Sequence, residues 1–152
     1  MFLVFLLCSS YLSAQGNALI VPGKGVGVLE LGEPINFIQQ DLDNTEPSNW
    51  RVTEEGNKKK VVLSYKDFGL TLVFDFETKR LERIIVMSPN LLVEGTGIHV
   101  GSSREEVLRY FKNPDGEAKG ELDYPGRGIK FILNKSLNAV YAIEVRERKI
   151  RD

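Results

Sequence analysis

The chain is poor in the residue types that build covalent, metal and catalytic sites. Cys8 is the only cysteine among 152 residues, which excludes an intramolecular disulfide. His99 is the only histidine and has no cysteine or serine partner in a recognisable motif, so neither a zinc site nor a nucleophilic triad is indicated. The sequence therefore predicts no catalytic residues, no metal site and no small-molecule cofactor.

An excess of positive charge is also missing. The chain has 20 Lys and Arg residues against 21 Asp and Glu residues, a formal net charge of −1. Phosphate binding needs a concentrated basic surface, and the only dense basic run is Lys58-Lys59-Lys60, which a solvated hairpin explains. We therefore expect no nucleic-acid partner.

No apolar run reaches the roughly 20 residues that a membrane-spanning helix needs. The N-terminal run MFLVFLL is short, and the small polar residues after it lead to Ala14, which suits a signal-peptide cleavage site. We predict that residues 1–14 are a signal peptide and that the protein is exported, either periplasmic or secreted. The mature chain would then contain no cysteine, as an oxidising compartment favours.

One pattern occurs twice. YKDFGLTLVF (65–74) and YPGRGIKFIL (124–133) each have a tyrosine four positions before a glycine, and apolar residues at every second position after it. A polar break and a second alternation in the same register follow both copies. Alternation of period two predicts a β-hairpin with one buried face, and an earlier strand ending at each tyrosine makes a three-stranded meander.

A helix is expected before each meander. Ser103 and Glu106 fit the S-x-x-E capping box, and Pro34 suits the first position of the other helix. The first half is longer, with room for an additional strand near Trp50–Thr53 and a turn at Glu55–Asn57. The apolar stripes at helical spacing are Ile35, Ile38 and Leu42 in the first helix, and Val107, Leu108 and Phe111 in the second.

These elements predict an α+β fold of two tandem repeats. Each repeat is a helix followed by a three- to four-stranded antiparallel sheet, with the helices on one face. The break at Pro89-Asn90 divides the chain into residues 15–90 and residues 91–152. A unit of this size has a marginal core on its own, so we expect the two halves to pack side by side, with one continuous sheet as a possible arrangement.

The stretch VGSSREEVLRYFKNPDG (100–116) resembles the glycine–helix–G-x-P signature of small envelope domains. These are the domains related to the β-lactamase inhibitor protein and to the BamE/SmpA-like lipoproteins. Asn113-Pro114 replaces the G-x-P end, and the disulfides of the inhibitor protein have no counterpart. The resemblance covers about residues 19–146 and implies helix-plus-sheet units, an envelope or extracellular setting, and work done by binding.

Two other patterns do not fit a chemical site. In the glycine-rich stretch 21–32, Lys24 is followed by Gly25 where a phosphate loop needs Ser or Thr, and Glu30 replaces the third glycine of G-x-G-x-x-G. Carboxylate pairs such as Asp41 and Asp43 fall in turns or on outward faces. Acid–base work needs environments that split two pKa values, which solvated carboxylates do not have.

The residues between the alternating apolar positions are expected to face away from the helices. One-sided antiparallel sheets normally carry polar residues there, but this face would include several apolar side chains. That mixture predicts a protein-binding surface, and the alternative is that the face packs against the other repeat or a terminal segment. The predicted protein-binding residues are Trp50, Val62, Val73, Ile85 and Ile132.

The sequence thus favours an exported, non-enzymatic protein-binding module, either inhibitor-like or envelope-assembly-like. Its partner would be a protein of the cell envelope or the extracellular space. Two alternatives stay open. One is a small-ligand-binding or hydrolytic protein with a cleft between the repeats. The other is a structural envelope protein with a lipid anchor on Cys8, although Leu7 is large for the position before a lipidated cysteine.

Overall fold

A computed structural model describes residues 18–116 and 118–150. The predicted signal peptide, residues 1–14, and Cys8 within it lie outside the described residues. Within the described part of the chain, no helix is long and apolar enough to cross a membrane.

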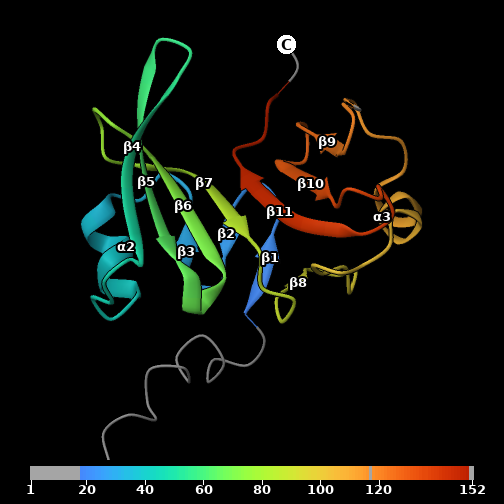
Figure 1. Ribbon diagram of the computed structural model, residues 1–152, viewed down its shortest axis with the longest axis horizontal. Coiled ribbons are helices and arrows are strands. Elements are labelled where there is room, and N and C mark those ends of the chain that lie inside the picture. Colours follow the sequence, from blue (N-terminus) through green and yellow to red (C-terminus); the bar gives the residue numbers. More distant parts are fainter. Residues whose placement is uncertain (1–17, 117, 151–152) are drawn as a thin grey trace, which may run out of the picture.

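Seven strands form one antiparallel sheet in the order β4-β5-β6-β7-β11-β10-β9 (Figure 1). Strands β4 to β7 make a first meander and β9 to β11 a second, and the pairing of β7 with β11 joins them. The first meander consists of β4 (Asn49–Glu55), β5 (Lys58–Tyr65), β6 (Leu70–Asp75) and β7 (Leu81–Val86). The second consists of β9 (Glu121–Tyr124), β10 (Ile129–Leu133) and β11 (Val140–Arg146).

A second, four-stranded sheet is built from very short strands in the order β3-β2-β1-β8. It contains β1 (Leu19–Val21), β2 (Gly25–Val26), β3 (Leu29–Glu30) and β8 (Leu92–Val93). Strand β1 pairs in parallel with β8, so that Ile20 lies opposite Val93. This sheet therefore links the N-terminal segment to the segment that precedes the second meander.

The two α-helices of the described residues are α2 (Ile35–Asp41) and α3 (Arg104–Phe111), and a 3-10 turn, η1, spans Lys66–Phe68. Figure 1 shows α2 beside the first meander and α3 beside the second, at opposite ends of the molecule. The predicted capping box is confirmed, because Glu106 N donates to Ser103 Oγ (3.2 Å) and Ser103 N donates to Glu106 Oε2 (2.7 Å). Pro34 is the N-cap of α2 and gives it no side-chain cap.

The core lies on one face of the seven-stranded sheet, which we call the inner face. Residues directly opposite each other in an antiparallel pair share a face, so Leu63, Leu72 and Ile84 mark this side. Both helices and the four-stranded sheet pack on the same core. They contribute Ile20, Val26, Leu29, Ile38, Val93, Val107 and Phe111 to a single buried apolar cluster.

The glycine of the second repeated pattern lies where two backbones meet. Gly128 has a φ of +72°, and a Cβ there would lie 2.4 Å from the carbonyl oxygen of Arg146 and 2.5 Å from Cα of Gly23. Gly23 N donates to Gly128 O at 3.2 Å. Only glycine leaves room for this approach, which brings the β1–β2 turn onto the β9–β10 turn.

The predicted fold of two helix-then-sheet repeats is wrong, although an α+β chain with antiparallel sheets is confirmed. The chain is mostly β, with two α-helices among the described residues and a second sheet beside the seven-stranded one. The pairing of β7 with β11 does join the two meanders in one continuous sheet, as the sequence allowed. Short strands from before both helices form a second sheet of their own. The physical reason is that each meander alone would leave an unpaired strand edge, which the β7–β11 pairing satisfies while enlarging the core.

Candidate functional site

The outer face of the seven-stranded sheet is the side opposite the core. Its residues alternate along each strand with those of the inner face. Two neighbouring rows cross the sheet at its centre. The first row is Arg51, Val62, Val73, Arg83 and Arg146, and the second is Asn49, Ser64, Thr71, Ile85, Glu144, Lys130 and Asp123.

Four of the five predicted protein-binding residues lie on this outer face. Val62 and Val73 are direct cross-strand partners, yet they are only 5% and 2% exposed. Lys60 and Arg83 occupy adjacent outer positions, and the aliphatic stems of such residues cover apolar neighbours. Ile85 and Ile132 are half-buried and lie on either side of β11.

Trp50 is separated from the other four residues. It lies opposite Leu63, a core residue, so its side chain belongs to the inner face. It is nevertheless 60% exposed, because β4 is at the edge of the sheet, beyond the elements that cover the core. The structure therefore does not bring Trp50 into one surface with Val62, Val73, Ile85 and Ile132.

Glu144 occupies the centre of the outer face and is only 4% exposed. Three cations surround its carboxylate, with Arg146 Nη1 at 3.5 Å, Arg83 Nη1 at 3.7 Å and Lys130 Nζ at 3.8 Å. Each cation also has a second acidic partner. These partners are Glu55 for Arg83, Glu121 for Lys130 and Asp123 for Arg146. The result is one connected array that joins β7, β11, β10 and β9 and includes Glu55 of β4, and it holds the charged side chains in fixed positions.

A smaller ion cluster occupies the outer face of the first meander. Lys60 Nζ lies 2.5 Å from Glu82 Oε2 and 3.6 Å from Asp75 Oδ2. Asp75 also accepts hydrogen bonds from the backbone N–H groups of Thr78 and Glu77, which close the β6–β7 turn. These bonds, with that of Thr78 N–H foremost, hold the pKa of Asp75 below its ordinary value, and the charge of Lys60 adds to them.

The charges of the outer face are mixed in sign. The residues that contribute them are Arg51, Lys60, Arg83, Lys130 and Arg146 on the positive side, and Glu55, Asp75, Glu82, Glu121, Asp123 and Glu144 on the negative side. Neither sign is concentrated there, so the face offers no continuous basic track for a nucleic-acid backbone. Its chemistry suits a partner that itself carries both charges and apolar groups.

Sequence reasoning missed this ion array. Glu144 and Arg146 alternate with the core residues Ile143 and Val145, so the same alternation that located the core also places these two on the outer face. Arg83 could be assigned in the same way. Their contact could not, because Arg83 and Glu144 meet only through the pairing of β7 with β11.

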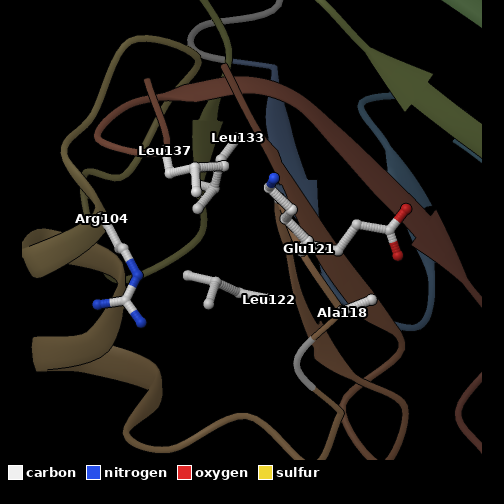
Figure 2. A pocket seen from close by; sticks show the side chains of 8 residues that line it. Arg104, Ala118, Glu121, Leu122, Leu133 and Leu137 are labelled. Atoms are coloured by element: carbon white, nitrogen blue, oxygen red, sulfur yellow. The ribbon is translucent and has the colours of Figure 1, made fainter. Parts of the chain in front are cut away.

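A pocket of about 210 Å³ lies at the α3 end of the molecule (Figure 2). Leu122 points into the space between Arg104 and Leu137, whereas the carboxylate of Glu121 is directed away from it. All lining residues fall in the range 104–137, so the pocket is within the second half of the chain and not between the two halves. It is smaller than the roughly 300–1,000 Å³ typical of small-molecule sites.

The structure also shows where His99 and the glycine-rich stretch lie and whether acidic residues cluster as metal ligands. His99 lies in the turn before α3 and not on a strand, and its Nδ1 is 3.2 Å from both Gly97 O and Ser102 Oγ. The glycine-rich stretch 21–32 forms β2, β3 and their turns. Within residues 18–116 and 118–150, no group of three His, Cys, Asp or Glu residues is placed to hold a metal ion.

Comparisons with known proteins support the fold. No protein-family model matches the chain, and no curated protein sequence matches it. The uncharacterized protein YfeY from Escherichia coli has a similar structure, with a TM-score of 0.59 and 17% identity over 84% of this chain and 99% of that chain. A crystal structure of an extracellular protein containing a SCP domain from Bacillus anthracis str. Ames gives a TM-score of 0.45 and 10% identity, over 77% of this chain and 44% of that chain.

The likeness to YfeY shows the fold alone, because so low an identity carries no information on activity. Neither structure is clearly related to the β-lactamase inhibitor protein or to the BamE/SmpA-like lipoproteins. The family resemblance of residues 100–116 therefore stays a prediction.

Proposed function

We propose that this protein is an exported, non-enzymatic protein-binding module that engages its partner through the outer face of the seven-stranded sheet. The partner is a protein of the cell envelope or the extracellular space. The observation that carries the proposal is the contrast between the two faces of the sheet. Both helices and the four-stranded sheet pack on the inner face, and in the part of the chain that the structure describes none of these elements lies in the outer face, whose side chains come from the sheet's own strands.

The composition of the outer face supports this role. Non-obligate protein interfaces combine apolar contacts with polar and charged groups, and their bulk hydrophobicity is that of ordinary surface. Ile85 and Ile132 supply half-buried apolar surface on both sides of β11, and the Glu144 array supplies charges of both signs between them. Charges held in place before binding give specificity and speed association with a complementary partner.

Val62 and Val73 are unsuitable positions for testing the outer face by mutation. Replacing either one with a charged residue would destabilise the fold, because they are almost fully buried. Ile85 and Ile132 are better positions, since their side chains are part-exposed. We therefore choose the double variant Ile85→Lys/Ile132→Lys to disturb the outer face.

The test is affinity capture from envelope extract, followed by titration of the captured protein in purified form. The matched control is Phe37→Lys/Tyr110→Lys, which replaces two exposed aromatic residues on α2 and α3, the helices that cover the inner face. We expect wild type and control to bind the same partner within about threefold, and the outer-face variant to bind at least about tenfold more weakly, a difference of 1.4 kcal/mol. Equal binding by all three proteins would show that the outer face is not the site.

Export is tested separately by locating the protein in the envelope or the medium and sequencing its mature N-terminus. A mature chain that begins at Gln15 is the expected result. Full-length protein in the cytoplasm would contradict this part of the proposal.

A further inference from the structure

The two edge strands of the seven-stranded sheet, β9 and β4, differ in how far their outer backbone groups are hydrogen-bonded. At one edge, β9 is short and the preceding loop covers it, because Asp115 N and Gly116 N donate to Asp123 O, and Asp123 N donates to Gly116 O. At the other edge, β4 runs for seven residues and pairs only with β5. Among the described residues, nothing forms a backbone hydrogen bond with the second side of β4.

A long uncovered edge presents a row of unpaired N–H and C=O groups that another strand can complete. Strand β4 also carries two exposed apolar side chains on the inner side, Trp50 at 60% and Val52 at 41%. Trp50 lies opposite the core residue Leu63, and Val52 lies opposite the core residue Val61. The two exposed side chains therefore continue the apolar inner face onto the edge strand. This combination marks the free edge of β4 as an interaction surface that borders the outer face.

We propose that β4 pairs with β4 of a second copy of this chain, in an antiparallel arrangement that joins the two seven-stranded sheets into one. The charges of β4 identify the partner. A two-fold axis between the two strands places one residue of β4 directly opposite the same residue of the second copy. Three residues in the middle of the strand can take this central position: Arg51, Val52 and Thr53.

The three registers differ in the charges that they bring together. Centring on Arg51 sets two arginines directly opposite each other, which is unfavourable. Centring on Val52 pairs no opposite charges, since Arg51 then lies opposite Thr53, and Asn49 opposite Glu55, of the second copy. Centring on Thr53 sets Arg51 opposite Glu55 of the second copy twice, once on each side of a central threonine pair, and sets Val52 opposite Glu54 on the inner side. The strand is therefore complementary to itself in the Thr53 register.

Both side chains of that pair are accessible in the single chain. Arg51 and Glu55 are exposed and point to the outer side of the sheet, and Arg51 makes no ion pair within the described residues. A two-fold axis perpendicular to the sheet keeps both outer faces on the same side. The dimer would present two copies of the Glu144 array side by side, and two linked sites raise avidity without new contacts.

The test uses sedimentation velocity together with the fluorescence of Trp50, the only tryptophan of the chain. Between about 1 µM and about 1 mM protein, wild type should pass from monomer to dimer, and the Trp50 emission should shift to shorter wavelength in parallel as the indole loses water. The proteins compared are wild type, Arg51→Glu, Glu55→Arg and the double variant Arg51→Glu/Glu55→Arg.

Each single variant places like charges opposite each other, so its dimer should dissociate at least about tenfold more readily than that of wild type. The double variant exchanges the two charges and should return to within about threefold of wild type, although Glu55→Arg also removes the partner of Arg83. Recovery in the double variant separates pairing between copies from a loss of stability within one copy.

Three results would overturn the proposal: a wild type that stays monomeric throughout, single variants that dimerise like wild type, or a double variant no better than the singles. The variant Ile85→Lys/Ile132→Lys should dimerise normally, because its substitutions are on strands away from β4. Failure of dimerisation and failure of outer-face binding are thus distinguishable.

Discussion

The first and second meanders of the seven-stranded sheet differ in the hydrogen bonding of their corresponding tyrosines. In the second, the hydroxyl of Tyr124 donates to Lys112 O at 2.8 Å, at the end of a helix whose start is closed by a capping box. In the first, Tyr65 is the corresponding tyrosine before the glycine. Its hydroxyl is buried, and no hydrogen-bond partner for it exists among the described residues. Helix α2 beside it has no side-chain cap.

The aromatic packing differs in the same direction. The rings of Phe111, Tyr124 and Phe131 form a closed cluster with centroids 5.1 to 6.1 Å apart. Among the residues that the structure describes, the first meander has one such ring pair, Tyr65 and Phe68, at 6.3 Å. Two segments with the same apolar alternation thus differ in hydrogen bonding and aromatic packing, because the partners of their side chains come from elsewhere in the chain, and we expect the second to be the more stabilising.

The largest expected difference between the meanders concerns their aromatic residues. Phe111 is buried and contacts two other rings, so Phe111→Ala should lower the free energy of unfolding by about 3–5 kcal/mol. Phe68 is only partly buried, and Phe68→Ala should cost less than half of that. Urea unfolding of both variants measures the difference. Equal losses would remove the distinction in packing between the two meanders.

The tyrosine hydroxyls give a smaller and sharper comparison. Tyr124→Phe removes the donor to Lys112 O and should destabilise the protein by about 1 kcal/mol. Tyr65→Phe removes a buried hydroxyl that has no partner among the described residues, so it should leave stability unchanged or raise it slightly. Thermal unfolding of the two variants is the measurement. If Tyr65→Phe lowered the stability as much as Tyr124→Phe, the Tyr65 hydroxyl would have a hydrogen-bond partner, contrary to this account.

The smallest expected effect is a dependence on pH. Burial, and secondarily the negative charge of Glu46, raise the pKa of Tyr65 above the ordinary tyrosine value of 10.0. A raised folded-state pKa means that above pH 10.0 the unfolded chain loses this proton first, so stability falls as pH rises. Tyr65→Phe should fall less steeply than wild type between about pH 9 and pH 11. Parallel curves for the two proteins would show that Tyr65 does not contribute.

The parts of the fold that follow from local patterns were predictable. The alternation after Gly69 and after Gly128 identifies strands whose side chains alternate between two faces, and S-x-x-E identifies the start of α3. The additional strand near Trp50 and its turn at Gly56 were predicted for the same reason. Such signals depend on residues a few positions apart.

The pairing of the halves was not predictable in this way. The β7–β11 ladder joins segments far apart in the chain, and no alternation specifies which edge meets which. Strands β1, β2, β3 and β8 have two or three residues each, too few for a period to be recognised.

For most of the predicted protein-binding residues, the sequence predicted which face of the sheet the side chain lies on. It did not predict how exposed the side chain is. Alternation places Val62 and Val73 on the outer face, but their exposure depends on the charged side chains around them. Trp50 was misplaced because it lies in the additional strand, which the repeated pattern does not contain. Its face is determined by the register of β4 against β5, in which it lies opposite Leu63.

The central claim is that the outer face binds a protein, and site-specific photo-crosslinking in the cells that make this protein tests it most directly. A benzophenone amino acid would replace Ile132 on the outer face in one variant and Tyr110 on the exposed side of α3 in another. The account predicts a discrete crosslinked protein from position 132 and none from position 110. Crosslinking from position 110 alone, or from neither position, would contradict it.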